Sequence, residues 1–236
     1  RAHVRAAADL IWLPRCPACN RRAENAPDQF CAACWSALRP LRPGGEPLAT
    51  GAPEPLAAYS VDPLFIQMLG AAKYQGYRTV LCRLARGAAS LLGERLSASG
   101  LPPGTLVPVP LAPAKRRERG FNQAEVFAAE LAAVFARDLR PWLVRRRSGP
   151  ALARLSRDER EAAVAGSYAA AAEFPGPAAG PVLLVDDVVT TGSTAAAARR
   201  ALGGDHGPVT HIVAMGRAFA TVADNLPPTP KILERL

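Results

Sequence analysis

The sequence predicts an α/β protein with a mainly parallel sheet flanked by helices, preceded by a small four-cysteine module. Three observations support this prediction. Two C-x2-C pairs lie close together within the first 34 residues. Short apolar runs alternate with helical patterns from residue 105 onward, an order typical of parallel sheets. A length of 236 residues with 49% hydrophobic and 21% charged residues suits a globular protein with a buried core.

The two cysteine pairs predict a structural zinc site. Eleven residues separate the pair Cys16 and Cys19 from the pair Cys31 and Cys34. Two such turns can place four thiolates around one zinc ion, and because no coordination position stays open, the zinc would be structural. Disulfides are the alternative; we favour zinc because the rest of the chain resembles a cytosolic protein kept reduced. Cys82 stands apart in a helical pattern and is expected to be a buried thiol.

The chain is expected to divide after residue 58. Residues 1–16 predict a short amphipathic helix; a charged residue interrupts their apolar stretch and no small-residue cleavage site follows, which argues against a signal peptide. Residues 36–58 contain five prolines and three glycines and predict a linker. Helix, cysteine module and linker would thus form residues 1–58, and the α/β domain residues 59–236. No run of eighteen apolar residues occurs, so no membrane span is expected.

The first half of the α/β domain is expected to begin with helices. Residues 59–76 and 78–97 have helical periodicity. The apolar run at 105–111 predicts the first core strand. A basic loop at 112–123 and a helix at 124–137 are expected to follow it.

The second half is expected to contain the central strand. Residues 141–165 are arginine-rich and weakly patterned, which predicts a mobile excursion. The run at 181–185 predicts a strand buried on both faces, because it is continuously apolar. A helix at 193–202 and a further strand at 209–215 are expected next, and the tail after residue 219 is polar.

Two adjacent aspartates and a hydroxyl-rich loop indicate a binding site. Asp186 and Asp187 follow the central strand, and ligands of open α/β sheets bind beyond the carboxyl ends of the strands. The next loop would present backbone N–H groups and hydroxyls at the start of a helix, which is a cradle for phosphate. Its residues are Thr190, Thr191, Gly192, Ser193 and Thr194. No Gly-Lys-Ser/Thr follows, so the loop is not a P-loop. Carboxylates before such a cradle suit a sugar phosphate, whose hydroxyls can donate to them; an N-capped helix with incidental acids is the alternative.

The net charge of +9 is unevenly distributed. Residues 113–160 contain twelve Lys or Arg against six Asp or Glu and so carry +6 of it. Such a basic region favours ligands that carry phosphate, either small molecules or nucleic acid. A solvated, arginine-rich helix face is the alternative. The three histidines, His3, His206 and His211, have no matching catalytic partners, so no Ser/His/Asp chemistry is expected.

A family resemblance follows from these motifs. The segment VLLVDDVVTTGST, residues 182–194, resembles the phosphoribosyl-pyrophosphate signature of type I phosphoribosyltransferases. The cysteine pairs, AAKYQGYR, VPVPLAPAKRRERGFNQAEVFA and this segment occur in an order similar to that of the ComF family of competence-associated proteins. The resemblance implies a type I phosphoribosyltransferase fold with an amino-terminal zinc ribbon. It also implies a cytoplasmic bacterial protein that works with competence proteins on imported single-stranded DNA.

The resemblance also implies roles for residues. Asp186 and Asp187 would hold the ribose hydroxyls as the catalytic pair, and residues 190–194 would bind the 5-phosphate. The pyrophosphate, with Mg²⁺, would meet the basic loop through Lys115, Arg116, Arg117 and Arg119. Lys73, Asn122 and Gln123 lie in matching segments without an assigned role; for Lys73 a phosphate contact and a surface position are both open.

This sequence departs from the family pattern in three places. Leu152 and Ala163 stand where family members commonly carry a glutamine and an asparagine, and residues 36–58 lack the second cysteine cluster that many members have. If the missing amides shape the acceptor site, transfer activity is in doubt, whereas binding of the sugar phosphate is not.

Three functions are therefore open. The first is a protein that binds phosphoribosyl pyrophosphate and acts in DNA uptake. The second is a nucleobase-salvage transferase, and the third is a non-catalytic DNA-binding or adaptor protein. An enzyme of this kind would displace pyrophosphate at the anomeric carbon of the sugar, mainly by positioning and electrostatics. The fold hosts both enzymes and regulators, so it does not decide between them.

Overall fold

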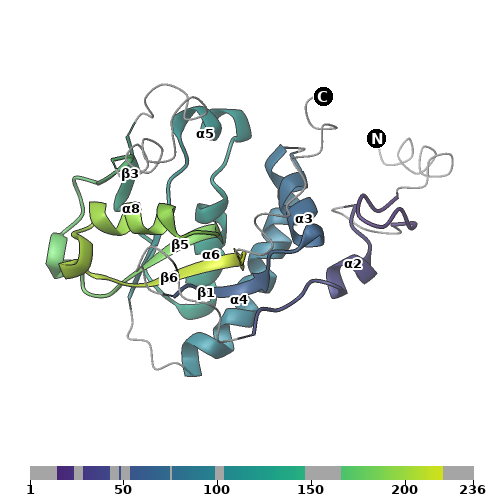
Figure 1. Ribbon diagram of the computed structural model, residues 1–236, viewed down its shortest axis with the longest axis horizontal. Coiled ribbons are helices and arrows are strands. Elements are labelled where there is room, and N and C mark those ends of the chain that lie inside the picture. The colour runs from purple at the N-terminus through teal and green to yellow at the C-terminus, as the bar shows by residue number, and fades with distance from the viewer. Residues whose placement is uncertain are drawn as a thin grey trace.

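The computed structural model describes residues 15–23, 29–42, 48, 54–74, 76–98, 104–146 and 166–219 (Figure 1). Within this part of the chain, four strands form a parallel sheet packed against helices, and the four cysteines gather near the amino terminus. The predicted α/β class is thus confirmed. Residues 1–14 of the expected first helix and the tail after residue 219 lie outside the described residues. No helix in the described ranges combines the length and the apolarity needed to cross a membrane.

The sheet has the strand order β1-β6-β5-β2, with every neighbouring pair parallel. These strands are β1 (Leu56–Ser60), β6 (Val209–Arg217), β5 (Val182–Val189) and β2 (Thr105–Pro108). The first four residues of β5 are fully buried, as its continuous apolar run predicts. β5 is longer than predicted, because Val188 and Val189 continue the pairing with β6. Asp186 and Asp187 therefore lie within the strand and not beyond its end.

Strand β1 is an element that the sequence did not predict. It begins inside the expected linker and spans the expected boundary after residue 58. Its sequence, LAAYS, has little intrinsic β-propensity, so the strand is stabilised mainly by its pairing with β6. Ala57 and Ala58 are buried, and Arg95 of α4 donates a hydrogen bond to the Ala57 carbonyl (3.0 Å). The expected helix at 59–76 accordingly begins later, as α3 (Pro63–Tyr74).

Helices cover both faces of the sheet. Helix α3, α4 (Arg78–Ala98) and α6 (Gln123–Phe135) share one core cluster with Leu183, Val185 and Val213 of the strands. On the other face, α8 (Ser193–Ala201) packs against Leu184 and Val107. Alternate residues of β5 thus belong to different cores, as the two-residue period of a strand requires. Cys82 on α4 is half-buried, not fully buried as expected.

Two segments expected to be irregular contain regular structure. The basic loop forms α5 (Pro113–Arg119), because proline at the first turn, good helix formers and Gly120 in the left-handed conformation (φ 75°) define a helix. In the expected excursion, β3 (Leu143–Arg145) pairs antiparallel with β4 (Tyr168–Ala170). Residues 147–165 lie outside the described part, and with them Leu152 and Ala163.

The amino terminus of α6 is tied to the end of β2. Asn122 is buried, and its side-chain oxygen accepts a hydrogen bond from the Ala124 amide (3.2 Å). Its side-chain nitrogen donates to the Val109 carbonyl (2.9 Å). Asn122 thus caps α6 and also fixes the chain after β2. The sequence pattern assigned no role to Asn122, and these two hydrogen bonds give it a structural one.

Candidate functional site

An open pocket, whose roughly 210 Å³ of free space merges with the bulk solvent, lies where β5 ends and α8 begins. Among its lining residues are the acid Asp186 and four residues of the expected cradle. The full lining comprises Asp186, Val188, Val189, Thr190, Gly192, Ser193, Thr194 and Ala195. Thr191 does not line the pocket, but its hydroxyl donates to Ser193 Oγ (3.2 Å) and accepts from the Ser193 amide (3.4 Å). The pocket therefore brings together one carboxyl group, several hydroxyls and a helix amino terminus.

The start of α8 is suited to an anion. Gly192 caps the helix in the left-handed conformation (φ 82°), where a side chain would be strained. As a cap residue, Gly192 has no side chain that could accept a hydrogen bond from the amides of the first turn. Apart from the long hydrogen bond of the Ser193 amide to the Thr191 hydroxyl (3.4 Å), the first turn thus keeps donor capacity for a ligand, at the positive end of the helix dipole. This is the arrangement by which helix amino termini bind phosphate.

The two aspartates lie on opposite faces of β5. Asp186 lines the pocket on the α8 face. Asp187 forms an ion pair with Lys73 Nζ (2.5 Å), which comes from the last turn of α3 on the other face. The Asp187 amide donates to Asp186 Oδ1, and the Val188 amide to Asp187 Oδ1 (both 2.8 Å). Of the expected pair, Asp186 lines this pocket, whereas Asp187 pairs with Lys73.

Asp186 has an unusual acidity. Burial, and to a lesser extent the charge of Asp187, raise the pKa of its carboxyl to about 8, although the Asp187 amide and the Lys73 charge act in the opposite direction. At neutral pH the carboxyl is therefore mostly protonated. It can then donate one hydrogen bond and accept others, which suits a ligand hydroxyl.

The β3–β4 ribbon contributes a contact between Arg145 and Tyr168. Arg145 Nη1 donates to the Tyr168 hydroxyl (3.1 Å), and its guanidinium lies 5.2 Å from the Tyr168 ring centroid. Burial raises the pKa of the Tyr168 hydroxyl. The positive charge of Arg145 lowers this pKa, and the negative charge of Asp186 raises it. Tyr168 thus lies within electrostatic reach of the pocket acid. Arg145 belongs to the basic region expected from the sequence, whereas no sequence signal pointed to Tyr168, because the ribbon was expected to be irregular.

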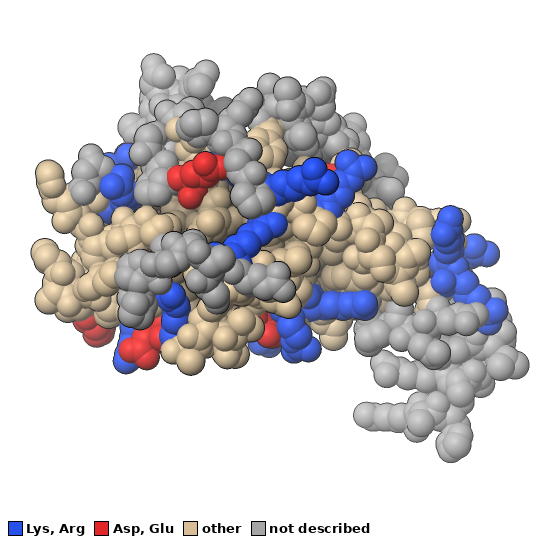
Figure 2. All heavy atoms as spheres, turned by 90° about the horizontal axis from the view of Figure 1, so that it is seen from below, with Lys and Arg blue, Asp and Glu red and all other residues tan. Residues whose placement is uncertain are grey.

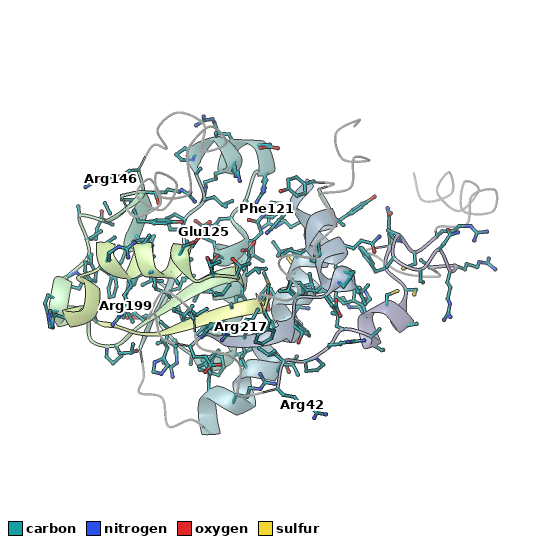
Figure 3. The ribbon with its side chains drawn as sticks, viewed as in Figure 1. Arg42, Phe121, Glu125, Arg146, Arg199 and Arg217 are labelled. Atoms are coloured by element: carbon teal, nitrogen blue, oxygen red, sulfur yellow. The ribbon has the colours of Figure 1, made fainter. Side chains whose placement is uncertain are left out.

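The basic residues of α5 do not line the pocket. Lys115, Arg116 and Arg117 are exposed, and Arg116 forms an ion pair with Glu125 at the start of α6. Figure 3 shows Glu125 and Phe121 in this region.

Arg119 is the only half-buried member of the four expected basic residues. Its Nη2 donates to the Tyr74 hydroxyl (3.1 Å), and its Nη1 donates to Gln123 Oε1 (3.4 Å). Gln123 is fully buried. Arg119 thus connects α5 to the end of α3, the helix that carries Lys73.

Basic charge is spread over the surface. Figure 2 shows Lys and Arg side chains at several separate places on one face, with Asp and Glu side chains beside some of them. Of the histidines, His206 is exposed, His211 is half-buried with a pKa lowered by burial, and His3 lies outside the described residues. The histidines in the described ranges do not line the pocket.

The four cysteines predicted as metal ligands converge. Their sulfur atoms all lie within 4.8 Å of one another, with Cys16 and Cys34 at 3.6 Å and Cys19 and Cys31 at 3.5 Å. A zinc ion with Zn–S distances of about 2.3 Å requires sulfur–sulfur separations of about 3.8 Å in a tetrahedron. All four thiols are free, so the disulfide alternative is not what the structure contains. The geometry and the donor set therefore fit a zinc ion.

Local hydrogen bonds favour a thiolate at this cluster. Burial raises the pKa of Cys16, but hydrogen bonds from the backbone of Cys31, Cys19 and Ala18 outweigh burial and bring it to about 6. The turn is closed by hydrogen bonds from the Asn20 amide to the Cys16 carbonyl and from the Cys16 amide to the Arg21 carbonyl (both 2.8 Å). Such a pre-shaped turn lowers the cost of ordering the ligands around a metal.

The four-cysteine module, residues 15–23 and 29–42, packs on the α/β part of the chain. Cys16, Phe30 and Leu38 belong to the same core cluster as α3 and α4. The guanidinium of Arg83 on α4 lies 4.2 Å from the Trp35 ring centroid of α2 (Ala32–Ser36). Figure 1 shows α2 at one end of the molecule, beside α3. The module and the helices thus share one hydrophobic core.

Comparisons with known proteins do not assign the chain to a family. No protein-family model matches it, and no curated protein is significantly similar to it. The parallel α/β sheet and the amino-terminal four-cysteine cluster are what the structure establishes.

Proposed function

We propose that this chain is a type I phosphoribosyltransferase-like protein of the ComF kind that binds phosphoribosyl pyrophosphate in the pocket at the end of β5. The observation that carries the proposal is the shared lining of that pocket by Asp186 and the first turn of α8. An anion cradle next to a carboxyl group matches a molecule with a phosphate and neighbouring hydroxyls.

The proposed binding mode follows from the donors and acceptors of the pocket. The amides at the start of α8, with the hydroxyls of Thr190, Ser193 and Thr194, would surround the 5-phosphate. Asp186 would bind a ribose hydroxyl, as an acceptor when ionised and also as a donor when protonated. Carboxylate and hydroxyl oxygens are hard ligands, so the site is compatible with the Mg²⁺ that neutralises a diphosphate.

The basic helix α5 supports a place for the diphosphate. It follows β2, which is the direct neighbour of β5 in the sheet. Arg119 faces Gln123 and Tyr74, whereas Lys115 and Arg117 are exposed on the same helix. We propose that the diphosphate lies between the pocket and this helix. In a transfer reaction, the bond from the anomeric carbon to the diphosphate oxygen would break as a bond to the acceptor nitrogen forms, and the diphosphate would leave with both bonding electrons.

A role with single-stranded DNA is the second part of the proposal. Its support is the concentration of +6 of the net charge in residues 113–160, with exposed basic side chains on α5 and at Arg146. Figure 3 shows Arg146 beside the β3–β4 ribbon. A cytoplasmic setting belongs to this proposal, because free thiols placed for a metal suit a reducing compartment.

Binding of the activated sugar can be tested by calorimetry on the zinc-loaded full chain with phosphoribosyl pyrophosphate and Mg²⁺. We expect saturable binding, and at least a tenfold loss of affinity in Asp186→Ala. The matched control is Asp138→Ala, an exposed acid paired with Arg140 outside the pocket lining. Equal affinity in wild type and Asp186→Ala, or absence of binding in wild type, would refute the assignment.

The DNA role has a separate test. Binding of single-stranded DNA should weaken steeply with salt if phosphates are neutralised by basic side chains. Replacing Lys115 and Arg117 by serine should reduce the slope of log affinity against log salt by roughly one to two. A slope unchanged by this substitution would contradict α5 as the DNA-binding element.

A further inference from the structure

Helix α3 contacts both candidate sites. Near its middle, Gln67 Nε2 donates a hydrogen bond to the Pro17 carbonyl (2.7 Å), in the turn between Cys16 and Cys19. In its last turn, Lys73 forms the ion pair with Asp187. The six residues from Gln67 to Lys73 cover about 9 Å along a helix axis. One short rigid element therefore connects the metal-ligand turn with the strand that carries the pocket acid.

The packing of α3 makes this connection stiff. Phe65, Met68 and Ala72 are fully buried, in the same core cluster as Cys16 and Cys34. Behind the helix, Gly216 of β6 allows a close approach: a Cβ at this position would lie 2.8 Å from the Phe65 ring. Close-packed cores transmit displacement instead of absorbing it. A shift of the cysteine turn would therefore move α3 as a body.

The end of α3 is an electrostatic junction. Lys73 and Asp187 have side-chain exposures of 19% and 18%, so their attraction is only partly screened by water. The adjacent Tyr74 accepts a hydrogen bond from Arg119. Lys73 also lies in the last turn of its helix, where a positive charge is favourable. The charged groups that act on Asp186 from this side are therefore Lys73 and Asp187.

A backbone hydrogen bond connects this junction to the pocket. The Asp187 amide donates to Asp186 Oδ1 (2.8 Å), so the orientation of the Asp186 carboxyl depends on the position of the Asp187 peptide. Lys73 in turn holds the Asp187 side chain on the α3 face. The order of contacts runs from the cysteine turn through Gln67, α3 and Lys73 to Asp187 and then to Asp186.

We propose that α3 is a positioning helix, in which Lys73 fixes Asp187 and thereby Asp186, and the metal-loaded four-cysteine turn holds the helix through Gln67. Lys73 and Gln67 are positioning residues and do not contact the ligand. The inference rests on the proposed binding of phosphoribosyl pyrophosphate for its effect on affinity. Its structural part, the coupling of the metal module to the end of β5, is independent of that ligand.

The first test replaces the charge in full-length, zinc-loaded protein. Lys73→Met should weaken phosphoribosyl pyrophosphate binding about tenfold, and Lys73→Arg should recover most of the loss, because Arg retains the charge that pairs with Asp187. Arg86→Met is the matched control. It removes a cation of α4 that forms an ion pair with Glu130 of α6, away from the pocket. Wild-type affinity in Lys73→Met, or no recovery in Lys73→Arg, would overturn the role of Lys73.

The second test needs no ligand. Amide hydrogen exchange should accelerate in residues 186–189 and in the last turn of α3 when zinc is removed. Gln67→Ala, which keeps all four cysteines, should accelerate the same amides about two- to fivefold while it retains zinc. Unchanged exchange at 186–189 in both the zinc-depleted protein and Gln67→Ala would refute the coupling. If wild type shows no sugar binding but the exchange pattern holds, the proposed function fails and the coupling stands.

Discussion

The four-cysteine cluster and the β5–α8 pocket are the two candidate binding sites described above. They differ in whether their ligating groups face one another or face an open space. The cysteine sulfurs point at one another and lie within 4.8 Å. The pocket donors line an open space of about 210 Å³ at the end of a strand. A closed set of donors suits an ion that stays, and an open set suits a ligand that comes and goes.

A structural site and a ligand-binding site should respond differently to mutation. The cysteine module is buried into the core of α3 and α4, so loss of its metal should affect folding first. The pocket residues Thr190, Ser193 and Thr194 are at least partly exposed, so their loss should affect ligand binding first.

Removal of the metal should have the largest effect. We expect chelation or Cys34→Ser to lower the free energy of unfolding by at least about 3 kcal/mol, because structural zinc contributes about 10 kcal/mol or more in small zinc domains. Calorimetric unfolding should show a midpoint lower by about 6 °C or more for a chain of this size. Cys82→Ser, a half-buried cysteine outside the cluster, is the control. A metal assay without zinc, or an unchanged midpoint, would contradict a structural role.

The pH dependence of stability should identify Asp186. Its folded pKa is raised from 3.8 to about 8, so between these values the folded state binds more protons than the unfolded state. Stability should therefore fall as pH rises from about 4 to 8, with a slope of up to ~1.4 kcal/mol per pH unit from this group.

Asp186→Asn removes this contribution and should flatten the profile, whereas Asp138→Asn should leave it as in wild type. Denaturant unfolding of each variant between pH 4 and 8, without ligand, measures this pH dependence of stability. A wild-type slope retained in Asp186→Asn would mean that this acid is not the source of the pH dependence.

Gly192→Ala should affect both stability and binding moderately. A side chain at φ 82° costs about 1–2 kcal/mol and would disturb the first turn of α8. We expect phosphoribosyl pyrophosphate affinity to fall about tenfold by calorimetry. Gly204→Ala also introduces a side chain at positive φ (65°), in open space beyond the carboxyl end of α8. It should cost stability without weakening binding; equal losses of affinity in both variants would argue against a specific cradle.

The smallest effect on stability is expected at an exposed ion pair on α5. Arg116 and Glu125 have side-chain exposures of 51% and 38%. Exposed pairs of this kind contribute less than about 1 kcal/mol. Arg116→Ala should therefore change the free energy of unfolding by less than that amount in denaturant titrations. A larger loss would show that α5 contributes more to the fold than its exposed residues indicate.

The closed site could be predicted almost completely from sequence, and the open one only in part. Four cysteines at fixed spacing determine their own convergence, since each pair lies in one tight turn. The pocket residues were also found, because a strand, two acids and a glycine-containing loop are consecutive in the chain. What the consecutive residues could not reveal was which aspartate faces the pocket, because that depends on the strand continuing to Val189.

The partners from distant segments were beyond the sequence. Lys73 and Asp187 are more than a hundred residues apart, and only the packing of α3 brings them together. Strand β1 forms because it pairs with the backbone of β6, not because its own residues favour a strand. Arg145 and Tyr168 meet because β3 and β4 pair across residues that have no strong pattern. Long-range pairing leaves little local signal, which is why these elements were missed.

The central claim is that the activated sugar binds where Asp186 and the first turn of α8 meet. The most direct measurement is the backbone amide NMR spectrum of the zinc-loaded chain during titration with phosphoribosyl pyrophosphate and Mg²⁺. We expect saturable shifts of the amides of Gly192, Ser193 and Thr194, larger than those of the cysteine module. Shifts confined to other regions, with these three amides unmoved at saturation, would contradict the central claim.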